Sequence, residues 1–552
     1  MATEGHAVRQ VPFRGAPVRS RVAAAFYRHW LEALIIFALV LLTAEILLTR
    51  YFPYSERNVT ESLQETFPSK LKIDHFHPVY FPRPGCEALG LTFRSVSGAA
   101  GEQPLVTIQK FIIQGNYANF LFRPHHISRV ILEGLRVQVP AVGKDGKFKG
   151  GYTDTQTTIG ELVTNGAVLE VARASKKPSL RFQIHELNLG SVSSKDGMSY
   201  KVRLQNPEPP GEIRSSGHFG PFNAGDPGQT PVSGTYAFHR GDLNVFDGIA
   251  GIVDSEGKFS GPLEHVDVQG STDVPDFEVD RSGHKGHLVT HFEGILDGTS
   301  GDVALNNVDA MYQNTKIAVK GSVADKKGYD GKFTSLDFAV RAGRLQDILR
   351  LIVKENRPPM SGVISLQAHS SVPPEGQPFL KEATLQGDFK ISDGHFENPS
   401  RQQSVDELSE TARGIKKSQQ NGDKNNDDKN NPTENVVSHA SGHVDLKNGV
   451  ATITNLSFSV PGADALVQGT FNVLNEKIDL HGTMKVEAKF SQSTSGIKSL
   501  FAKVLDPFFN KKRGSVVPVV VNGTYHDPHF GIDLNPAKKS KNLKAKAQPP
   551  AA

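Results

Sequence analysis

The sequence predicts a mainly β protein in which a long antiparallel sheet follows a single N-terminal transmembrane helix. The first observation is one long apolar stretch near the N-terminus, at Trp30–Thr49. The second is that apolar and polar residues alternate beyond it, which is typical of strands with one buried and one solvated face. The third is a series of Asn-Gly and Asp-Gly pairs, which favour hairpin turns. With 552 residues, the chain has room for several ordinary domains or one elongated domain.

The stretch Trp30–Thr49 has the length of a membrane-spanning helix. At about 1.5 Å of rise per residue it would span about 30 Å, the thickness of the hydrocarbon core of a bilayer. Its acidic residues, Glu32 and Glu45, lie near its ends, where a carboxylate can reach the headgroups. A cleaved signal peptide is the alternative, but the stretch is too long and no small-x-small site follows it. The residues that we expect to hold this anchor in the bilayer are Trp30, Leu34, Ile35, Phe37, Leu41 and Leu47.

The flanking charges give the orientation of this anchor. Five arginines and a single acidic residue, Glu4, precede it, whereas the charges after it are mixed. The positive-inside rule therefore places residues 1–29 in the cytoplasm and everything after Thr49 on the far side of the membrane. Residues 1–29 and the basic tail 536–552 lack periodicity and are expected to be disordered. We expect the same of an insertion at about 415–436, because 420–435 contains no apolar side chain.

Strand patterns begin near Lys70. The stretch Ile127–Val139 predicts a strand with Ile127, Ile131, Leu135, Val137 and Val139 on one face. Ala383–Ile391 places Leu385, Phe389 and Ile391 on one face, and Lys477–Phe490 does the same with Ile478, Leu480, Met484 and Val486. Because the opposite faces are polar, the pattern indicates antiparallel pairing with one wet face. The expected turns are Asp145-Gly146, Asn165-Gly166, Asp196-Gly197, Asp297-Gly298, Asp393-Gly394 and Asn448-Gly449.

A few short amphipathic helices interrupt the strand patterns. Val59, Leu63 and Phe67 recur at helical spacing, and Pro68 ends that helix. A stripe over Leu345–Val353 predicts a second helix, which ends before Pro358. A basic helix is expected over Ile497–Leu505, either on a membrane surface or over the open end of the sheet.

The sequence shows little catalytic chemistry. It has no nucleophile elbow, no phosphate-binding loop and no zinc-protease motif, so we expect no enzyme and no cofactor. His75 and His77 share a strand face and His125 and His126 are adjacent, but no further ligands accompany either pair, so we expect no metal site. Asp273, Asp276, Glu278 and Asp280 lack the spacing of a calcium loop. The single cysteine, Cys86, is expected to be a small buried filler. A net charge of +4 does not favour a nucleic-acid partner.

The order of several stretches resembles the AsmA-like family of bacteria with two membranes, to which TamB is related. The anchor is followed by LKIDHFHPVYFPRPGCEALGLTF at 71–93 and by 106–140, which ends in a strand of the type found in the family. Further along come GTSGDVALNNVDA, IAVKGSV and GRLQDILRL within 296–351, then PMSGVISLQ and TLQGDFKISDGHFENP. The last are LDPFF and VVPVVVNGTYHDPHFGIDL within 469–534. The chain departs from the family in its insertion at 420–435 and in being much shorter than the largest relatives.

The resemblance implies a curled, β-taco-like antiparallel sheet over residues 50–535 that forms a periplasmic groove with an apolar inner face. It also implies phospholipid movement and a role in outer-membrane biogenesis, with the helix in the inner membrane. About thirty strands at roughly 4.8 Å would reach on the order of 140 Å. Alternation alone does not distinguish this groove from a closed sandwich. The alternative function is a non-transporting envelope scaffold with an outer-membrane or envelope protein partner.

Overall fold

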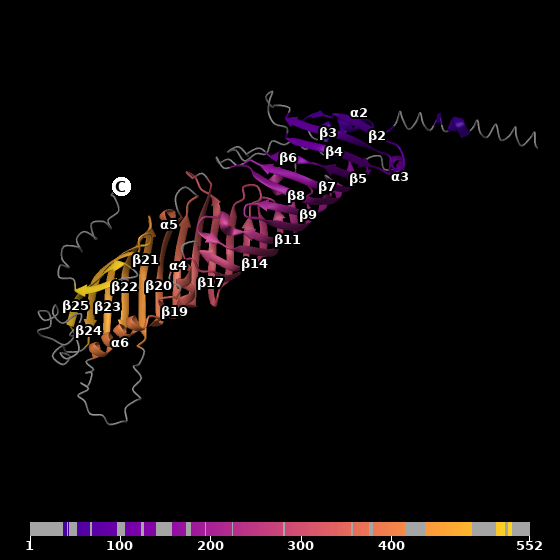
Figure 1. The fold of residues 1–552 in the computed structure, drawn as a ribbon. Helices are drawn as coiled ribbons and strands as arrows, with labels where there is room; N and C mark the ends of the chain where they lie inside the picture. Colours follow the sequence, from indigo (N-terminus) through magenta and orange to yellow (C-terminus); the bar gives the residue numbers. More distant parts are fainter. Residues whose placement is uncertain are drawn as a thin grey trace, which may run out of the picture.

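The structure is a computed structural model, and the fold is one long sheet of strands that follow one another nearly in chain order (Figure 1). It describes residues 37–40, 42–43, 52–66, 69–95, 105–122, 126–139, 157–172, 178–193, 195–223, 225–279, 282–329, 331–354, 357–374, 379–413, 436–487, 515–524 and 528–532. The 26 strands of these residues belong to a single sheet. The protein is therefore mainly β, as the alternation predicts.

The N-terminal part of the sheet is its least regular. It comprises β1 (Ser69–Lys72), β2 (His75–Val79), β3 (Gly85–Ser95), β4 (Val106–Gln114), β5 (His126–Glu133), β6 (Arg136–Val139) and β7 (Thr158–Val171). Both β1 and β2 pair with β3. Both β5 and β6 lie between β4 and β7, and their pairing with β7 is parallel. The expectation of a purely antiparallel sheet is therefore wrong here.

The rest of the sheet is an antiparallel meander in which each strand, apart from one short strand, pairs with the next. The first half of this meander comprises β8 (Leu180–Ser193), β9 (Gly197–Pro207), β10 (Pro210–Phe219), β11 (Pro231–Asp242), β12 (Ile249–Ala250), β13 (Ile252–Pro262), β14 (Val266–Val279), β15 (Gly286–Leu296), β16 (Val303–Tyr312) and β17 (Thr315–Asp325). The short β12 pairs with β14 beyond the end of β13, so these two strands share one position. The 3-10 turns η1 (Pro227–Gln229) and η2 (Leu243–Val245) flank β11.

The second half of the meander continues in the same way to the last described strand. It comprises β18 (Lys332–Arg344), β19 (Met360–Val372), β20 (Thr384–Phe396), β21 (Ser438–Lys447), β22 (Val450–Val460), β23 (Ala463–Asn472), β24 (Lys477–Val486), β25 (Ser515–Thr524) and β26 (Pro528–Ile532). Bulges shift the register in many of these pairs, as between Val340 and Gly343 or Ile453 and Leu456. Such bulges increase the local twist and bend the strands, which suits a long sheet that is curved along its length (Figure 1).

Three helices lie against the sheet, and a buried core forms under each. The helices are α2 (Glu56–Thr66), α4 (Leu345–Ile352) and α6 (Pro399–Arg413). Under α2, Val59 packs with Leu91 and Phe111 of the first strands. Under α4, Leu345 packs with Val340 and Ile364. Under α6, Ala412 packs near the ends of β22 and β23. The short helices α3 (Tyr117–Phe122) and α5 (Phe379–Glu382) complete the described elements.

The predicted helices at Val59–Phe67 and Leu345–Val353 are confirmed as α2 and α4, although α2 begins earlier, at Glu56. The strands over Ala383–Ile391 and Lys477–Phe490 are confirmed as β20 and β24, although β24 ends at Val486. Three of the predicted turns join consecutive strands, at Asp196-Gly197, Asp297-Gly298 and Asn448-Gly449. In the last of these both residues have positive φ, 52° and 73°, as the hairpin turn requires.

Two predicted turns are wrong, because they lie inside strands. Asn165-Gly166 falls within β7, where Gly166 has φ of 70°. Asp393-Gly394 falls within β20, where Asp393 has φ of 54° and the register shifts against β21. A residue with positive φ creates a bulge as readily as a turn, so these dipeptides do not separate the two cases.

The predicted strand Ile127–Val139 is in fact two strands with different faces. Gly134 has φ of 64° and breaks the ladder between β5 and β6. In β5 the buried side chains are Val130 and Leu132, not Ile131. Val137 of β6 pairs with Val106 of β4. The prediction of one apolar face over this stretch is therefore wrong, because the break changes the alternation.

Several predictions fall wholly or mostly outside the described residues. These are the membrane anchor Trp30–Thr49, the tails, the insertion at about 415–436, the helix over Ile497–Leu505 and the turn at Asp145-Gly146. Within the anchor, residues 37–40 and 42–43 are helical and exposed. No helix of the described residues has the length and apolar character needed to cross a bilayer.

Candidate functional site

One face of the sheet is apolar along the series of strands, and we call it the apolar face. Residues that pair directly across an antiparallel ladder point to the same side, so the register connects side chains from strand to strand. One such row joins Leu385 of β20, Leu446 of β21, Ala451 of β22, Phe471 of β23 and Ile478 of β24. The alternate residues, such as Gln386 and Asp479, form the opposite, polar face.

The structure brings all seven predicted groove residues onto the apolar face. A second row joins Ile391 of β20 through Ala440, Phe458 and Ala465 to Met484 of β24. Phe389 lies on β20 two residues from Ile391, and Leu480 lies on β24 two residues from Ile478. Both are therefore on the same face as the rows. Val486 pairs with Ala463 on this face as well. Residues far apart in the chain therefore share one surface.

Most of the apolar face is half-buried, and no second sheet of the described residues covers it. All described strands belong to the one sheet, and the described buried clusters lie where α2, α4 and α6 pack. Away from these helices, Leu385, Phe389, Ile478, Leu480 and Met484 keep part of their surface accessible to solvent. Two of the predicted residues differ, since Ile391 packs against the cluster under α4 and Val486 against the cluster under α6.

The apolar face changes character between β9 and β15, where glycines and hydroxyl groups replace branched side chains. Tyr236 of β11 lies over Gly257 and Gly270 of the next two strands, so that a Cβ at either glycine would lie 2.8 Å from an atom of its side chain. Tyr200 lies over Gly234 in the same way, at 2.6 Å. The aromatic rings therefore lie close to the backbone, and this part of the face is flatter than the parts on either side.

The tyrosine and serine hydroxyl groups of this flat part are hydrogen-bonded to one another and to backbone carbonyl oxygens. Ser215 Oγ donates to Thr235 O at 2.9 Å, so Tyr200 Oη, at 3.1 Å, donates to Ser215 Oγ. The same arrangement recurs at Tyr236 and Ser255, which are 3.3 Å apart. Burial raises the pKa of both tyrosines, so both hydroxyls stay protonated. Because these hydroxyls already have partners, covering them with an apolar ligand costs less than covering free polar groups.

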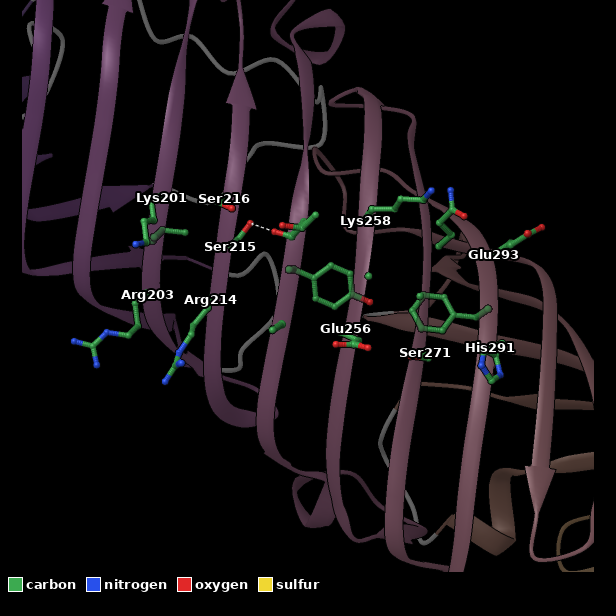
Figure 2. Close-up of a pocket in the computed structure, with 18 of the residues that line it drawn as sticks. Lys201, Arg203, Arg214, Ser215, Ser216, Glu256, Lys258, Ser271, His291 and Glu293 are labelled. Carbon is green, nitrogen blue, oxygen red and sulfur yellow. Dashed lines mark hydrogen bonds between the residues drawn. The ribbon is translucent and has the colours of Figure 1, made fainter.

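A shallow hollow of about 1150 Å³ crosses strands β8 to β16 in this flat part of the sheet (Figure 2). Tyr236 and Phe292 are among the residues at the hollow, but most of its lining residues, such as Glu256 and His291, alternate with the apolar row along the strands and belong to the polar face. In Figure 2 Arg203 and Arg214 lie toward one end of the hollow and His291 lies toward the other. The hollow is therefore bordered mainly by polar and charged residues.

The two arginines at one end of the hollow are direct partners in the ladder between β9 and β10. Glu212 offsets the repulsion between Arg203 and Arg214 through a 2.6 Å ion pair with Arg214. The hydrogen bond of that pair lowers the pKa of Glu212, so the carboxylate stays ionised. Glu186 lines the hollow as well and pairs directly with Arg203 in the ladder between β8 and β9, so two carboxylates face the two arginines at this end.

The acidic and histidine residues singled out in the sequence do not gather into a metal-binding cluster within the described part of the chain. No group of three or more His, Cys, Asp or Glu side chains in that part could hold a metal ion. His75 and His77 are both exposed on β2. Asp273 pairs with His287 at 2.6 Å, while Asp276 accepts a hydrogen bond from Ile252 N at 2.8 Å, so these two carboxylates act separately. Asp280 and His125 lie outside the described residues.

Cys86 is buried in the core under α2, as expected for a small filler. Burial raises the pKa of its thiol from 9.0 to about 12. The thiol therefore stays neutral in the folded protein well above the pH at which an unfolded chain would ionise it. The pKa of the thiol is higher in the folded chain than in the unfolded chain. The contribution of the neutral, buried thiol to stability is therefore fully present below pH 9 and is lost as the pH rises toward 12.

We expect Cys86 to resist thiol reagents in the native protein at pH 8, because the reactive thiolate is absent and the side chain is inaccessible. Ellman's reagent should modify no thiol per chain before denaturation and one thiol per chain in guanidinium, since Cys86 is the only cysteine. Rapid modification of the native protein would show that the core under α2 opens readily.

Comparisons of the chain with family models, curated proteins and solved structures found no match.

The candidate site is therefore a surface, not a cluster of reactive groups. Sequence alternation located two parts of it, on β20 and β24. It missed the flat, hydroxyl-bearing part between β9 and β15, although repeated Gly-x-aromatic triplets mark it, at Gly217–Phe219, Gly234–Tyr236 and Gly257–Phe259.

Proposed function

We propose that this chain is an AsmA-like, inner-membrane-anchored periplasmic protein that carries phospholipid along the apolar face of its sheet. In this role it contributes to outer-membrane biogenesis and envelope lipid homeostasis. The observation that supports the proposal most is the apolar face that the register traces from β20 to β24, over which the described residues place no second sheet. A closed sandwich would have buried that face in a filled core.

Acyl chains on this face would remove apolar surface from water on both partners. At about 25 cal/mol per Å² of apolar surface, covering even a few hundred Å² contributes several kcal/mol. The open side of the curved sheet would leave the charged headgroups in water, where they avoid the cost of burial. A contiguous apolar surface of this extent on a protein in water is typical of a binding surface.

The length of the sheet sets the reach of this path. Because β1 and β2, β5 and β6, and β12 and β13 share positions, the 26 strands occupy 23 positions. The 22 spacings between these positions, at roughly 4.8 Å each, give a path about 105 Å long. The estimate of thirty strands and 140 Å from the sequence is therefore larger than the described sheet.

A lipid-transfer assay with the full chain tests the proposal. The protein is reconstituted in donor vesicles that contain a fluorescent phospholipid, and the appearance of this lipid in acceptor vesicles is followed. We expect transfer faster than in protein-free vesicles. A rate equal to that of protein-free vesicles would contradict carriage of lipid and leave the envelope scaffold, with a protein partner, as the better proposal.

A further inference from the structure

The loop between β2 and β3 carries the most exposed of the large apolar side chains in the part of the chain that the structure describes. Phe81 is 84% exposed, and its neighbours Tyr80, Pro82 and Arg83 are exposed as well. A single exposed phenylalanine is ordinary on a protein surface. Here, however, it belongs to a group, because Tyr117 of α3 is also exposed and its hydroxyl donates a hydrogen bond to the carbonyl oxygen of Tyr80. We call this group the loop 80–83 patch.

The patch packs against the residues that directly follow the expected anchor in the chain. The ring of Phe52 lies 4.7 Å from the ring of Tyr80 and 5.6 Å from the ring of Tyr54. Phe52 is 3% exposed and Tyr54 7% exposed, so this segment is embedded in the first core of the sheet. Phe52 follows Thr49, the last residue of the expected anchor, by three residues, which span at most about 10 Å.

With the proposed anchor in a bilayer, these contacts would place the patch at the depth of the membrane surface. The interfacial layer on each side of a bilayer is roughly 5 to 8 Å thick, comparable with the distance that the three linking residues can span. Aromatic side chains are favoured in that layer, and an arginine can extend its charged end toward phosphate groups from there. In Figure 1 α2, α3 and β2 lie together at the same end of the sheet.

We infer that the loop 80–83 patch inserts into the lipid headgroup layer beside the anchor and holds the first strands of the sheet against the bilayer. The anchor would then be one of two membrane contacts. Together they fix the direction in which the apolar face leaves the membrane, which a single helix with a flexible linker would not do. This inference rests on the proposed anchor and is independent of whether the sheet carries lipid.

Tryptophan fluorescence in vesicles tests the inference with the full chain. Trp30 is the only tryptophan, so Trp30→Phe combined with Phe81→Trp gives a single reporter in the patch. The vesicles contain phosphatidylcholine and phosphatidylglycerol, with or without brominated acyl chains, which quench tryptophan on contact. The control is Tyr329→Trp in the same background, because Tyr329 is 50% exposed in the turn between β17 and β18, far along the sheet.

We expect brominated lipid to lower the emission of the patch reporter, at position 81, about twofold, because an indole in the headgroup layer lies close to the acyl chains. The control reporter, at position 329, should be unchanged. If the protein floats with the vesicles but the patch reporter is no more quenched than the control reporter, the inference is wrong and the anchor stands. If the protein does not float with the vesicles, the anchor is wrong and the inference fails with it.

Discussion

Replacing Leu385 and Leu480 together by glutamate is expected to reduce phospholipid transfer to the rate of protein-free vesicles. Both side chains are half-buried on the apolar face, and register rows of β21 to β23 connect their strands. An acyl chain that crosses this part of the face would have to bury a carboxylate, which costs several kcal/mol. Since about 1.4 kcal/mol corresponds to a tenfold change in affinity, the loss should exceed tenfold.

The matched control for this double variant places the same charges on the opposite face. Gln386 and Thr483 are exposed and lie on the polar face, one and three residues along the same strands. Gln386→Glu with Thr483→Glu should transfer lipid at the normal rate. Both variants should keep the hydrogen-exchange protection of β20 and β24, because the substituted positions are accessible to solvent. Equal rates for the two variants would contradict a role for the apolar face.

Gly217→Ala and Gly482→Ala are each expected to destabilise the sheet locally by about 1 to 3 kcal/mol, the usual cost of overpacking. A Cβ at Gly217 would lie 1.9 Å from Ser233 O, and a Cβ at Gly482 would lie 2.0 Å from Leu466 O. Because these contacts are with backbone, neighbouring strands have to move apart. Hydrogen exchange should become faster in β9 to β11 for the first variant and in β23 to β25 for the second.

Each glycine variant is a control for the other, since the two sites lie in distant parts of the sheet. A neutral control is Gly225→Ala, where the nearest neighbour of the new Cβ would be Asn223 Oδ1 at 3.5 Å. That change should stay within about 0.5 kcal/mol, as surface substitutions usually do. Strands contact mainly their sequence neighbours, so the loss should remain local. Uniform loss of protection over the whole sheet would contradict this description of its stability.

Sequence alternation predicted the two-residue period of the strands but not its interruptions. It located β20 and β24 because apolar and polar residues alternate there without a break. It failed at Gly134, where the ladder breaks between β5 and β6, and at Asp393-Gly394, where a bulge resembles a turn in sequence. Both failures concern residues with positive φ. The residue type shows that positive φ is allowed, but it does not show whether the residue lies in a turn or interrupts a ladder.

The number of layers could not be derived from alternation, because a sandwich and an open sheet require the same pattern. It depends on which strands pair across long loops, and pairing is a property of the folded chain. The contacts between tyrosines and glycines in β9 to β15 could not be predicted either, because they depend on the strand register, which places Tyr236 opposite Gly257. The anchor prediction rests on length and charge alone and concerns mostly residues outside those described.

The most direct test of lipid carriage is site-specific photocrosslinking along the sheet. A photoreactive benzoylphenylalanine is placed singly at Phe338, Phe389 or Leu480 on the apolar face, or at the adjacent polar-face positions Asp337, Lys390 or Asp479. After illumination of the full chain in membranes, mass spectrometry detects attached phospholipid. We expect phospholipid adducts at all three apolar positions and none at the three polar positions. Adducts at both sets alike, or at neither, would contradict a lipid path on the apolar face.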